Sequence, residues 1–173
     1  MNAPVLRTAR LVLRPHRLSD VEASVALWGD PEVVRHITGR ASTPQGLWFR
    51  VLRYAGHWAL LGFGYWAVEE AESGAFVGEV GFADYRREID PPLGGAPELG
   101  YAFVRRAHGK GYATEACSAA VNWARAHFPT GTRFACIVAP ENVPSIRVAE
   151  KCGFTLVCET TYNGDPALIY ERH

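Results

Sequence analysis

The chain has 173 residues, the length of one domain whose core needs no metal or disulfide to stabilise it. Lys and Arg together number 18, as do Asp and Glu, so no protein-wide basic field favours nucleic acid. Hydrophobic residues make up 48% of the chain, but no run approaches the roughly 18 apolar residues of a membrane span, and no signal peptide is recognisable. We therefore expect a single domain over residues 1–173, cytoplasmic, monomeric or homodimeric, that binds neither nucleic acid nor membrane.

The residue types that usually bind metals are not arranged as a metal site. The cysteines form no C-x-x-C pair, and the histidines have no ligand spacing. We expect no metal, and we interpret the cysteines as reduced, small hydrophobic residues of the core.

The first half of the chain predicts a strand, two helices and a β-hairpin. Residues 10–14 form the first strand, and Ser19 with Glu22 matches a capping box for a helix that Gly29 ends. A second helix begins between Ser42 and Gln45. Residues 64–69 and 76–83 then have strand character around a polar turn.

The second half alternates strands and helices. The predicted strands are 98–104, 132–139, 154–160 and 167–172, and the predicted helices are 111–127 and 144–152. The apolar face of the helix 111–127 is built almost entirely of small residues, which allows close packing on a sheet. This order favours a mixed sheet with helices on both faces, an α+β fold in α/β/α layers.

One stretch, "RAHGKGYATE" at 106–115, has the character of an anion site. It follows a strand and begins a helix, where backbone N–H groups lack partners and the helix dipole is positive. A Walker loop requires Ser or Thr where this chain has Gly111, and a dinucleotide fingerprint requires glycine where it has Thr114. Taken alone, the stretch is equally compatible with a tight turn that carries a lysine.

Two motifs together resemble a known family. Arg106-x-x-Gly109-x-Gly111 fits the R/Q-x-x-G-x-G/A pattern of the GNAT N-acetyltransferases. Downstream, N-x-x-S at Asn142 to Ser145, followed by E-K-x-G-F, resembles the RimJ/RimL-like branch that acetylates ribosomal-protein N-termini. The resemblance extends from Thr8 to Phe154.

The resemblance implies the GNAT acyl-CoA N-acyltransferase fold, with a mostly antiparallel sheet and a splayed central strand pair. It also implies acetyl-CoA as cosubstrate. The loop amides would bind the CoA pyrophosphate, the strand before the loop would pair with the pantetheine arm, and a strand N–H near Tyr101 or Ala102 would polarise the acetyl carbonyl. The residues expected to contact the cofactor are Tyr101, Ala102, Phe103, Val104, Arg106, His108, Gly109, Lys110, Gly111, Tyr112, Ala113, Asn142, Ser145 and Lys151.

Catalysis requires an acid for the leaving thiolate and a base for the amine. Many GNAT members place a tyrosine acid where this chain has Ala149, so the resemblance implies Ser145 as the substitute, with Asn142 bonding the pantetheine amide. Glu98 is the first candidate base and Glu79 the second. Structural interpretations stay open beside these roles: helix capping for Asn142 and Ser145, and solvated strand charges for the two glutamates.

The predicted activity is acetyl transfer to a primary amine, on a small molecule or on a peptide or protein N-terminus, by direct attack in a ternary complex. Aromatic residues concentrated before residue 70 either shape the acceptor site or belong to the core. Because Ala149 departs from the family pattern, a non-catalytic acyl-CoA-binding or regulatory module is the alternative. A nucleotide-binding switch is a third possibility.

Overall fold

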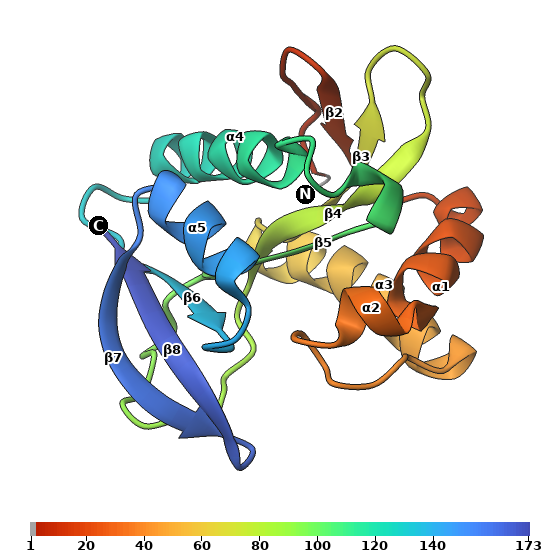
Figure 1. Ribbon diagram of the computed structural model, residues 1–173. Coiled ribbons are helices and arrows are strands. Elements are labelled where there is room, and N and C mark those ends of the chain that lie inside the picture. The colour runs from red at the N-terminus through yellow and green to blue at the C-terminus, as the bar shows by residue number, and fades with distance from the viewer. Residues whose placement is uncertain (1–2) are drawn as a thin grey trace.

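The computed structural model describes residues 3–173 as eight strands and five α-helices (Figure 1). The strands are β1 (Leu6–Arg7), β2 (Leu11–Arg14), β3 (Tyr65–Glu70), β4 (Phe76–Ala83), β5 (Glu98–Phe103), β6 (Phe134–Val138), β7 (Thr155–Tyr162) and β8 (Asp165–Arg172). The helices are α1 (Val21–Gly29), α2 (Pro31–Val34), α3 (Pro44–Leu61), α4 (Tyr112–His127) and α5 (Val143–Lys151), with 3-10 turns η1 (Leu18–Asp20) and η2 (Arg105–Ala107).

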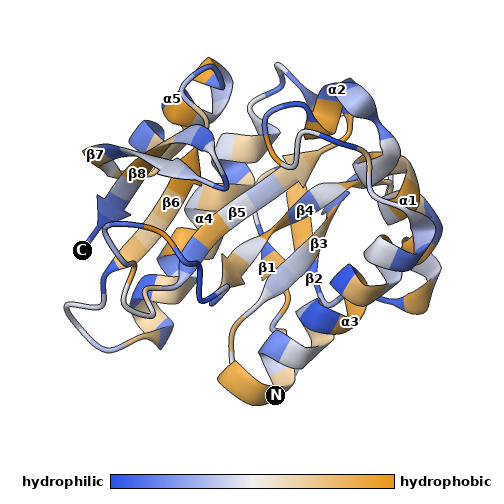
Figure 2. Ribbon diagram, turned by 90° about the horizontal axis from the view of Figure 1, so that it is seen from below, coloured by the Kyte–Doolittle hydropathy of each residue, from blue (hydrophilic) through white to orange (hydrophobic). Residues whose placement is uncertain are grey.

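All of these strands form one sheet in the order β1-β2-β3-β4-β5-β6-β8-β7. Every neighbouring pair is antiparallel except β5 and β6, which are parallel. Helices α1 and α3 cover one face of the sheet, and α4 and α5 lie over the other (Figures 1 and 2). The predicted α/β/α layers and mixed, mostly antiparallel sheet are confirmed.

The sheet opens between its two central strands. Within residues 3–173, β5 and β6 pair only through Glu98 and Ala135, at the beginning of β5. Beyond this pair, β5 keeps its antiparallel register with β4 as far as Phe103, while β6 pairs with β8 on its other side. In this part of the chain, the backbone edge of β5 that faces β6 therefore has no strand partner, as the predicted splay requires.

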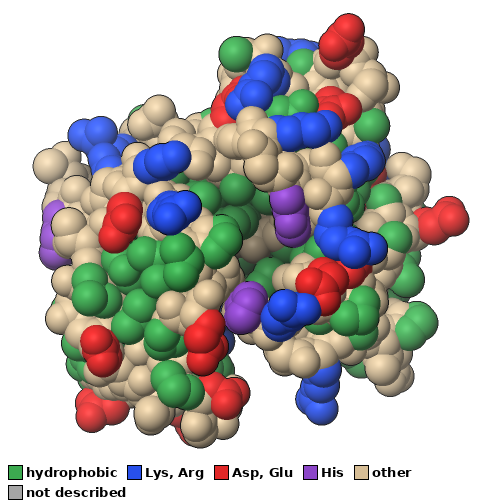
Figure 3. Space-filling model, in the orientation of Figure 1, with side chains coloured by type: hydrophobic (Ala, Val, Ile, Leu, Met, Phe, Trp, Pro, Cys, Tyr) green, Lys and Arg blue, Asp and Glu red, His purple; other side chains and the backbone are tan. Residues whose placement is uncertain are grey.

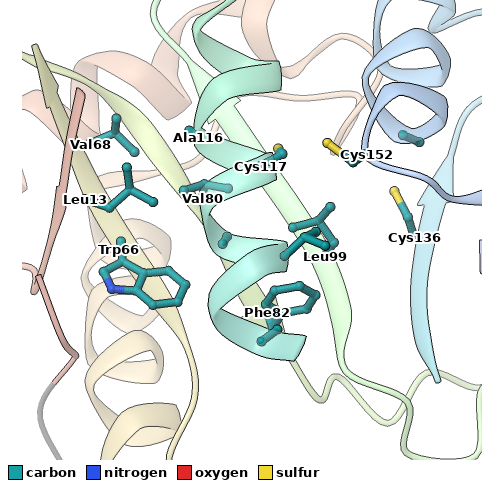
Figure 4. Close-up of a cluster of buried hydrophobic side chains, with 14 of the residues drawn as sticks. Leu13, Trp66, Val68, Val80, Phe82, Leu99, Ala116, Cys117, Cys136 and Cys152 are labelled. Carbon is teal, nitrogen blue, oxygen red and sulfur yellow. The ribbon is translucent and has the colours of Figure 1, made fainter. Parts of the chain in front are cut away.

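The packing of α4 on the sheet explains why the apolar face of this helix is made of small side chains. Ala116, Cys117, Ala120 and Ala124 of α4 are fully buried. Figure 4 shows Ala116 close to Val80 and Cys117 on the side of Leu99, with Phe82 of the sheet further along the same helix. Small side chains let the helix axis approach the strands, and larger residues of β2 to β5 fill the layer beneath.

The structure differs from the sequence prediction at three places near the N-terminus. Strand β1, two residues long, and helix α2, which Asp30 caps through the Glu32 N–H, are absent from the prediction. The Ser19–Glu22 capping box is wrong, because Ser19 is exposed and the carboxylate of Asp20 instead accepts from the Arg17 N–H and the Arg14 guanidinium. The charge-assisted hydrogen bonds of the buried Arg14–Asp20 pair stabilise this turn more than a hydrogen bond from an exposed serine hydroxyl would.

Neither a membrane span nor a metal cluster is found among residues 3–173. None of the described helices is both long enough and apolar enough to cross a bilayer. In the same residues, no group of three or more His, Cys, Asp or Glu side chains is arranged to hold a metal ion. The four cysteines are unpaired, and three of them, Cys117, Cys136 and Cys152, are buried.

Candidate functional site

The glycine-rich loop between β5 and α4 presents a row of unpaired backbone N–H groups. Gly109 and Gly111 have φ values of +74° and +79°, a left-handed conformation that glycine adopts without strain. Within residues 3–173, the amides of residues 109–114 donate no hydrogen bond. A Cβ at Gly109 would meet nothing within 4 Å, so the backbone there is open to a ligand. The loop therefore fits an oxyanion such as a pyrophosphate.

The charged side chains around the loop have different surroundings. Arg106 donates from Nη2 to the Phe76 carbonyl at 2.7 Å, which ties its guanidinium to β4. The His108 ring Nε2 lies 2.8 Å from the Phe103 carbonyl, so this nitrogen carries a proton and closes the turn. Lys110 is exposed, and its ammonium lies 5.8 Å from the centre of the Tyr112 ring. Lys110 is thus the one of these three side chains that makes no hydrogen bond to a backbone carbonyl within residues 3–173.

Arg10 braces the loop from the N-terminal side. It forms an ion pair with Glu115 at 2.6 Å and donates to the Lys110 carbonyl at 2.9 Å. Its guanidinium also lies over the Tyr112 ring, 4.9 Å from the ring centre. Because these contacts hold the carbonyl of Lys110 on the Arg10 side, the amides of the loop are free to face outward.

Strand β5 has the shape needed to bind an extended ligand. Residues Tyr101, Ala102, Phe103 and Val104 follow the point where β5 leaves β6 and lead directly into η2 and the loop. An unpaired strand edge binds an extended chain through backbone hydrogen bonds, as an added strand would. The edge and the loop form one continuous surface. The backbone groups of the β5 edge can pair with an extended chain at one end, and the amides of the loop can bind an anion at the other.

The side chain of Tyr101 reaches the first turn of α5. Its hydroxyl donates to Ser145 Oγ at 2.8 Å, and the Asn142 side chain accepts from the Ser145 N–H at 3.3 Å. Asn142 therefore caps α5, and Ser145 bonds to both the cap and the strand. Burial raises the pKa of Tyr101, so its hydroxyl stays protonated and remains a donor. Ala149 is buried one turn further along α5, while Lys151 is exposed in the last turn.

Glu98 begins β5 and is bound by an arginine. Arg87 donates from Nε and Nη2 to the two carboxylate oxygens at 2.6 and 2.7 Å. The pair is part-buried, and the Arg87 guanidinium also lies over the rings of Tyr85 and Tyr162. Each oxygen of Glu98 accepts one bond from Arg87 and keeps a lone pair for a water molecule.

Glu79 is fully buried in β4, directly opposite Ala102 of β5. It accepts from Ser24 Oγ at 2.7 Å, Trp28 Nε1 at 2.8 Å and the Tyr54 hydroxyl at 3.0 Å. Burial alone would raise the pKa of Glu79, but His16, 3.5 Å away, together with Ser24 and Trp28 holds that pKa below its ordinary value. A carboxylate so well supplied with donors is a weak base and a strong structural anchor.

Three tyrosines lie on the same face of the sheet as Glu79 and Glu98. Tyr54 of α3 stacks on Tyr65 of β3 with ring centres 4.5 Å apart, and Tyr85 donates to the Tyr65 hydroxyl at 3.2 Å. A Cβ on Gly100 would lie only 2.0 Å from the Tyr65 hydroxyl, which therefore sits directly over β5. Along β5, Gly100 lies midway between Glu98 and Ala102 on one face, so the Tyr65 hydroxyl is between these two positions.

The aromatic residues of the first 70 positions divide between core and surface. Tyr54, Trp58 and Trp66 are buried, whereas Trp48 and Phe49 are exposed on α3. Figure 3 shows the molecule hollowed between the half that holds α5 and β6 and the half that holds α1 and α2, with Lys and Arg side chains along its upper and right margins. In the orientation that Figures 1 and 3 share, this hollow lies over β5, the strand that leads into the loop.

The chain matches a family model and a curated relative over most of its length. Residues 10–155 match the model described as an acetyltransferase (GNAT) domain. The protein belongs to the GNAT acetyltransferase family. It is 30% identical over 149 residues to the uncharacterized protein YkkB of Bacillus subtilis, covering 84% of this chain and 81% of YkkB.

Solved structures agree with this assignment. A GnaT-family acetyltransferase from Bordetella pertussis has a TM-score of 0.86 and 28% identity, covering 99% of this chain and all (100%) of that one. RimL, a ribosomal L7/L12 α-N-protein acetyltransferase in complex with coenzyme A, has a TM-score of 0.77, 18% identity and 98% and 97% coverage. Spermidine N-acetyltransferase from Vibrio cholerae, in complex with CoA and spermine, has a TM-score of 0.72, 17% identity and 95% and 96% coverage. The last two likenesses are of fold.

Several residues of the GNAT site cannot be identified from the sequence patterns. The sequence predicts a role only for the backbone N–H of Tyr101. The hydrogen bond between its hydroxyl and Ser145 is seen only in the structure. Tyr65 and Arg87 carry no sequence signal, because their contacts with Gly100 and Glu98 join different elements. Alternation along β5 offers one signal: Tyr101 has the opposite parity to Glu98 and Gly100, which directs it toward the α4 and α5 face.

Proposed function

We propose that this protein is an acetyl-CoA-dependent N-acetyltransferase that acetylates a primary amine in the cytoplasm. The acceptor is a small molecule or a peptide or protein N-terminus, and it attacks directly while both substrates are bound. One observation carries the proposal: the unpaired amides of residues 109–114 continue the open edge of β5. A pyrophosphate with a long amide-containing arm, as in CoA, is complementary to both parts.

The residues around β5 that would act as acid and as base lie on opposite faces of the sheet. The bound acetyl-CoA supplies a thioester whose carbonyl accepts the amine. The strand amides near Tyr101 and Ala102 would hold the carbonyl oxygen, which accumulates negative charge as the amine attacks. Val104 and the loop residues Arg106, His108, Lys110, Tyr112 and Ala113 would surround the polar end of the cofactor, and Lys151 would add charge at its margin.

The acid side of the reaction is assigned to the α4 and α5 face. Ser145 Oγ–H would give its proton to the departing sulfur, and the Tyr101 hydroxyl, which donates to Ser145 Oγ, would replace that proton. This pair offers a proton donor in a chain that has Ala149 where many relatives carry a tyrosine. Asn142 fixes the first turn of α5 and so the position of Ser145.

The base side is assigned to the tyrosine face. The amine would lose its proton to Glu98 through water along the Tyr65 hydroxyl, which lies over Gly100. Glu98 is favoured over Glu79 because each of its oxygens accepts a bond from one side chain, Arg87, whereas Glu79 already accepts bonds from three side chains. Glu79 then serves to anchor α1 and α3 against β4 beside the acceptor.

The test is CoA release from acetyl-CoA across a panel of amines and peptides, with the acetylated product identified by mass spectrometry. We expect amine-dependent release with sequential kinetics, and a lower kcat for Glu98→Gln with little change for the exposed control Glu72→Gln. Binding of acetyl-CoA without release across the panel would instead favour the non-catalytic acyl-CoA-binding module. Stronger thermal stabilisation by ATP or GTP than by acetyl-CoA would contradict both interpretations.

A further inference from the structure

The tyrosine cluster on the α1 and α3 face has Tyr54 and Tyr65 buried in the core and Tyr85 half-buried at its edge. Tyr54 and Tyr65 stack nearly parallel, with an interplanar angle of 9°. Tyr85 extends the cluster through its hydroxyl contact with Tyr65. Burial raises the pKa values of Tyr54 and Tyr65, so neither ring contributes a negative charge near neutral pH. Tyr54 and Tyr65 are therefore neutral, and the half-buried ring of Tyr85 is the part of the cluster that can pack against an aliphatic chain.

Two arginines of α3 place their guanidinium groups close to aromatic rings beside this cluster. The Arg50 guanidinium lies 3.7 Å from the centre of the Trp28 ring, and the Arg53 guanidinium lies 5.1 Å from Tyr85 and 6.0 Å from Tyr54. The two residues are three positions apart on one helix, so their side chains project from neighbouring positions of one face. Both guanidinium groups are within the range of cation–π contact, which attracts the charge to the ring while leaving N–H donors available to a ligand.

Both arginines carry a charge that no carboxylate contacts directly within residues 3–173. No ion pair of these residues includes Arg50 or Arg53. The carboxylates on this face are already engaged, since Glu79 accepts from Ser24, Trp28 and Tyr54, and Glu98 pairs with Arg87. Burial acts to lower the pKa of half-buried Arg50, but Tyr54, Tyr85 and Glu79 outweigh it and raise the pKa, so Arg50 stays charged on this face.

We infer that the acceptor amine also carries an anionic group, a carboxylate or a phosphate, which Arg50 and Arg53 bind while the amine lies at the open edge of β5. This inference rests on the proposed acetyltransferase function. Guanidinium groups bind both anions through paired N–H donors. Tyr85 lies beside Arg53, and its hydroxyl donates to that of Tyr65 over Gly100, so an aliphatic spacer between the amine and the anion would lie along Tyr85. A polyamine would place a second positive charge beside the two arginines and is disfavoured.

The experiment compares acceptors that differ in one charge. The probes are 5-aminopentanoate, its neutral carboxamide 5-aminopentanamide, 3-aminopropyl phosphate and spermidine. We expect kcat/KM for one of the two anionic amines to exceed that of the carboxamide by about 10-fold or more, and the preference to shrink at high salt. The ratio between the carboxylate and the phosphate identifies which anion the site takes.

Variants separate anion binding from general damage to the site. Arg50→Gln and Arg53→Gln should each lower kcat/KM for the anionic amine about 10-fold while leaving that for the carboxamide unchanged. Arg125→Gln, an exposed position of α4, is the matched control. Arg50→Lys keeps the charge and should retain part of the preference. Equal rates for the charged and neutral amines, a preference for spermidine, or equal losses on both amines would overturn the inference.

A binding measurement keeps the test independent of turnover. Titration calorimetry of 5-aminopentanoate and 3-aminopropyl phosphate into CoA-saturated protein should detect binding of one anion that the Arg50→Gln/Arg53→Gln double variant loses. If the protein binds an anionic amine in this way but no amine is acetylated, the proposed function fails and the anion site stands. If amines are acetylated but neither anion binds more tightly than the carboxamide, the inference fails and the function stands.

Discussion

The hydroxyl of Tyr101 lies 2.8 Å from Ser145 Oγ and joins the open strand β5 to the first turn of α5 across the gap between β5 and β6. This contact brings two proton donors together at the point where the sheet splays. It also gives Tyr101, which leaves β5 toward α4 and α5, a role distinct from that of the strand backbone.

Tyr101→Phe and Ser145→Ala should not act independently. If Tyr101 supplies protons through Ser145, each variant should lower kcat by roughly 10-fold or more, and the double variant should be little worse than Ser145→Ala alone. Steady-state kinetics of the four proteins gives the coupling, and CoA affinity, measured by calorimetry, should change little. Losses that multiply would show that the two hydroxyls act separately.

The pH dependence of the same variants provides a second check. Because burial raises the pKa of Tyr101, its hydroxyl stays protonated as the pH rises through the ordinary range of tyrosine, near 10. The ratio of wild-type to Tyr101→Phe kcat should therefore stay constant between about pH 7 and pH 9. A ratio that falls toward one within this range would mean that the hydroxyl ionises and is not the donor.

Substitution of Gly109 or Gly111 by alanine should weaken acetyl-CoA binding more than it weakens the fold. Both residues have positive φ, so alanine strains the loop by about 1–2 kcal/mol and turns the unpaired amides away from the ligand. Gly131 follows α4 with φ of +85°, and a methyl group there would meet nothing within 4 Å, so it is the matched control. Gly131→Ala should lower the melting temperature similarly and leave the acetyl-CoA Kd unchanged. Unchanged affinity in the Gly109 and Gly111 variants would refute the loop assignment.

Glu79→Gln should destabilise the protein in a way that depends on pH. Gln places an N–H₂ group where Ser24, Trp28 and Tyr54 need acceptors, which costs about 1–3 kcal/mol. The folded-state pKa of Glu79 lies below its ordinary value of 4.5, so the stabilisation is complete above that value and is lost as the pH falls through the folded pKa. Urea unfolding at about pH 7 and about pH 3 should show the difference between wild type and variant shrinking at the lower pH. Glu72→Gln, in the exposed turn after β3, is the control and should show no such dependence.

The contact of Tyr65 with Gly100 can be measured by a compensating pair of substitutions. Gly100→Ala places a methyl 2.0 Å from the Tyr65 hydroxyl and should cost about 1–3 kcal/mol through overpacking. Tyr65→Phe removes that oxygen and leaves the ring carbon Cζ 3.3 Å from the methyl, so Gly100→Ala should cost less in this background. Chemical denaturation of the four proteins gives the coupling energy. Additive costs would mean that the Tyr65 hydroxyl does not sit over β5 in solution.

Local patterns are sufficient to predict most of the secondary structure. The small apolar face of α4 predicts both the helix and its close approach to the sheet, and alternating residues predict the β3–β4 hairpin. They fail where an element is very short, as in β1 and α2, and at Ser19, where an ion pair between Arg14 and Asp20 replaces the expected cap. Such pairings depend on neighbours that a single window of sequence does not contain.

The sequence by itself determined the family, the layered fold and the anion-binding loop, because the glycines, the following helix and the second motif at Asn142 are each encoded within a few consecutive residues. Only the tertiary structure decided how the reactive side chains are partnered. It joined Tyr101 to Ser145, surrounded Glu79 with the donors of Ser24, Trp28 and Tyr54, and paired Glu98 with Arg87. Within residues 3–173, it left Arg50 and Arg53 without an ion pair. Hydrogen bonds and charge pairs act over a few ångströms of space, so residues far apart in the chain set the chemistry of this site.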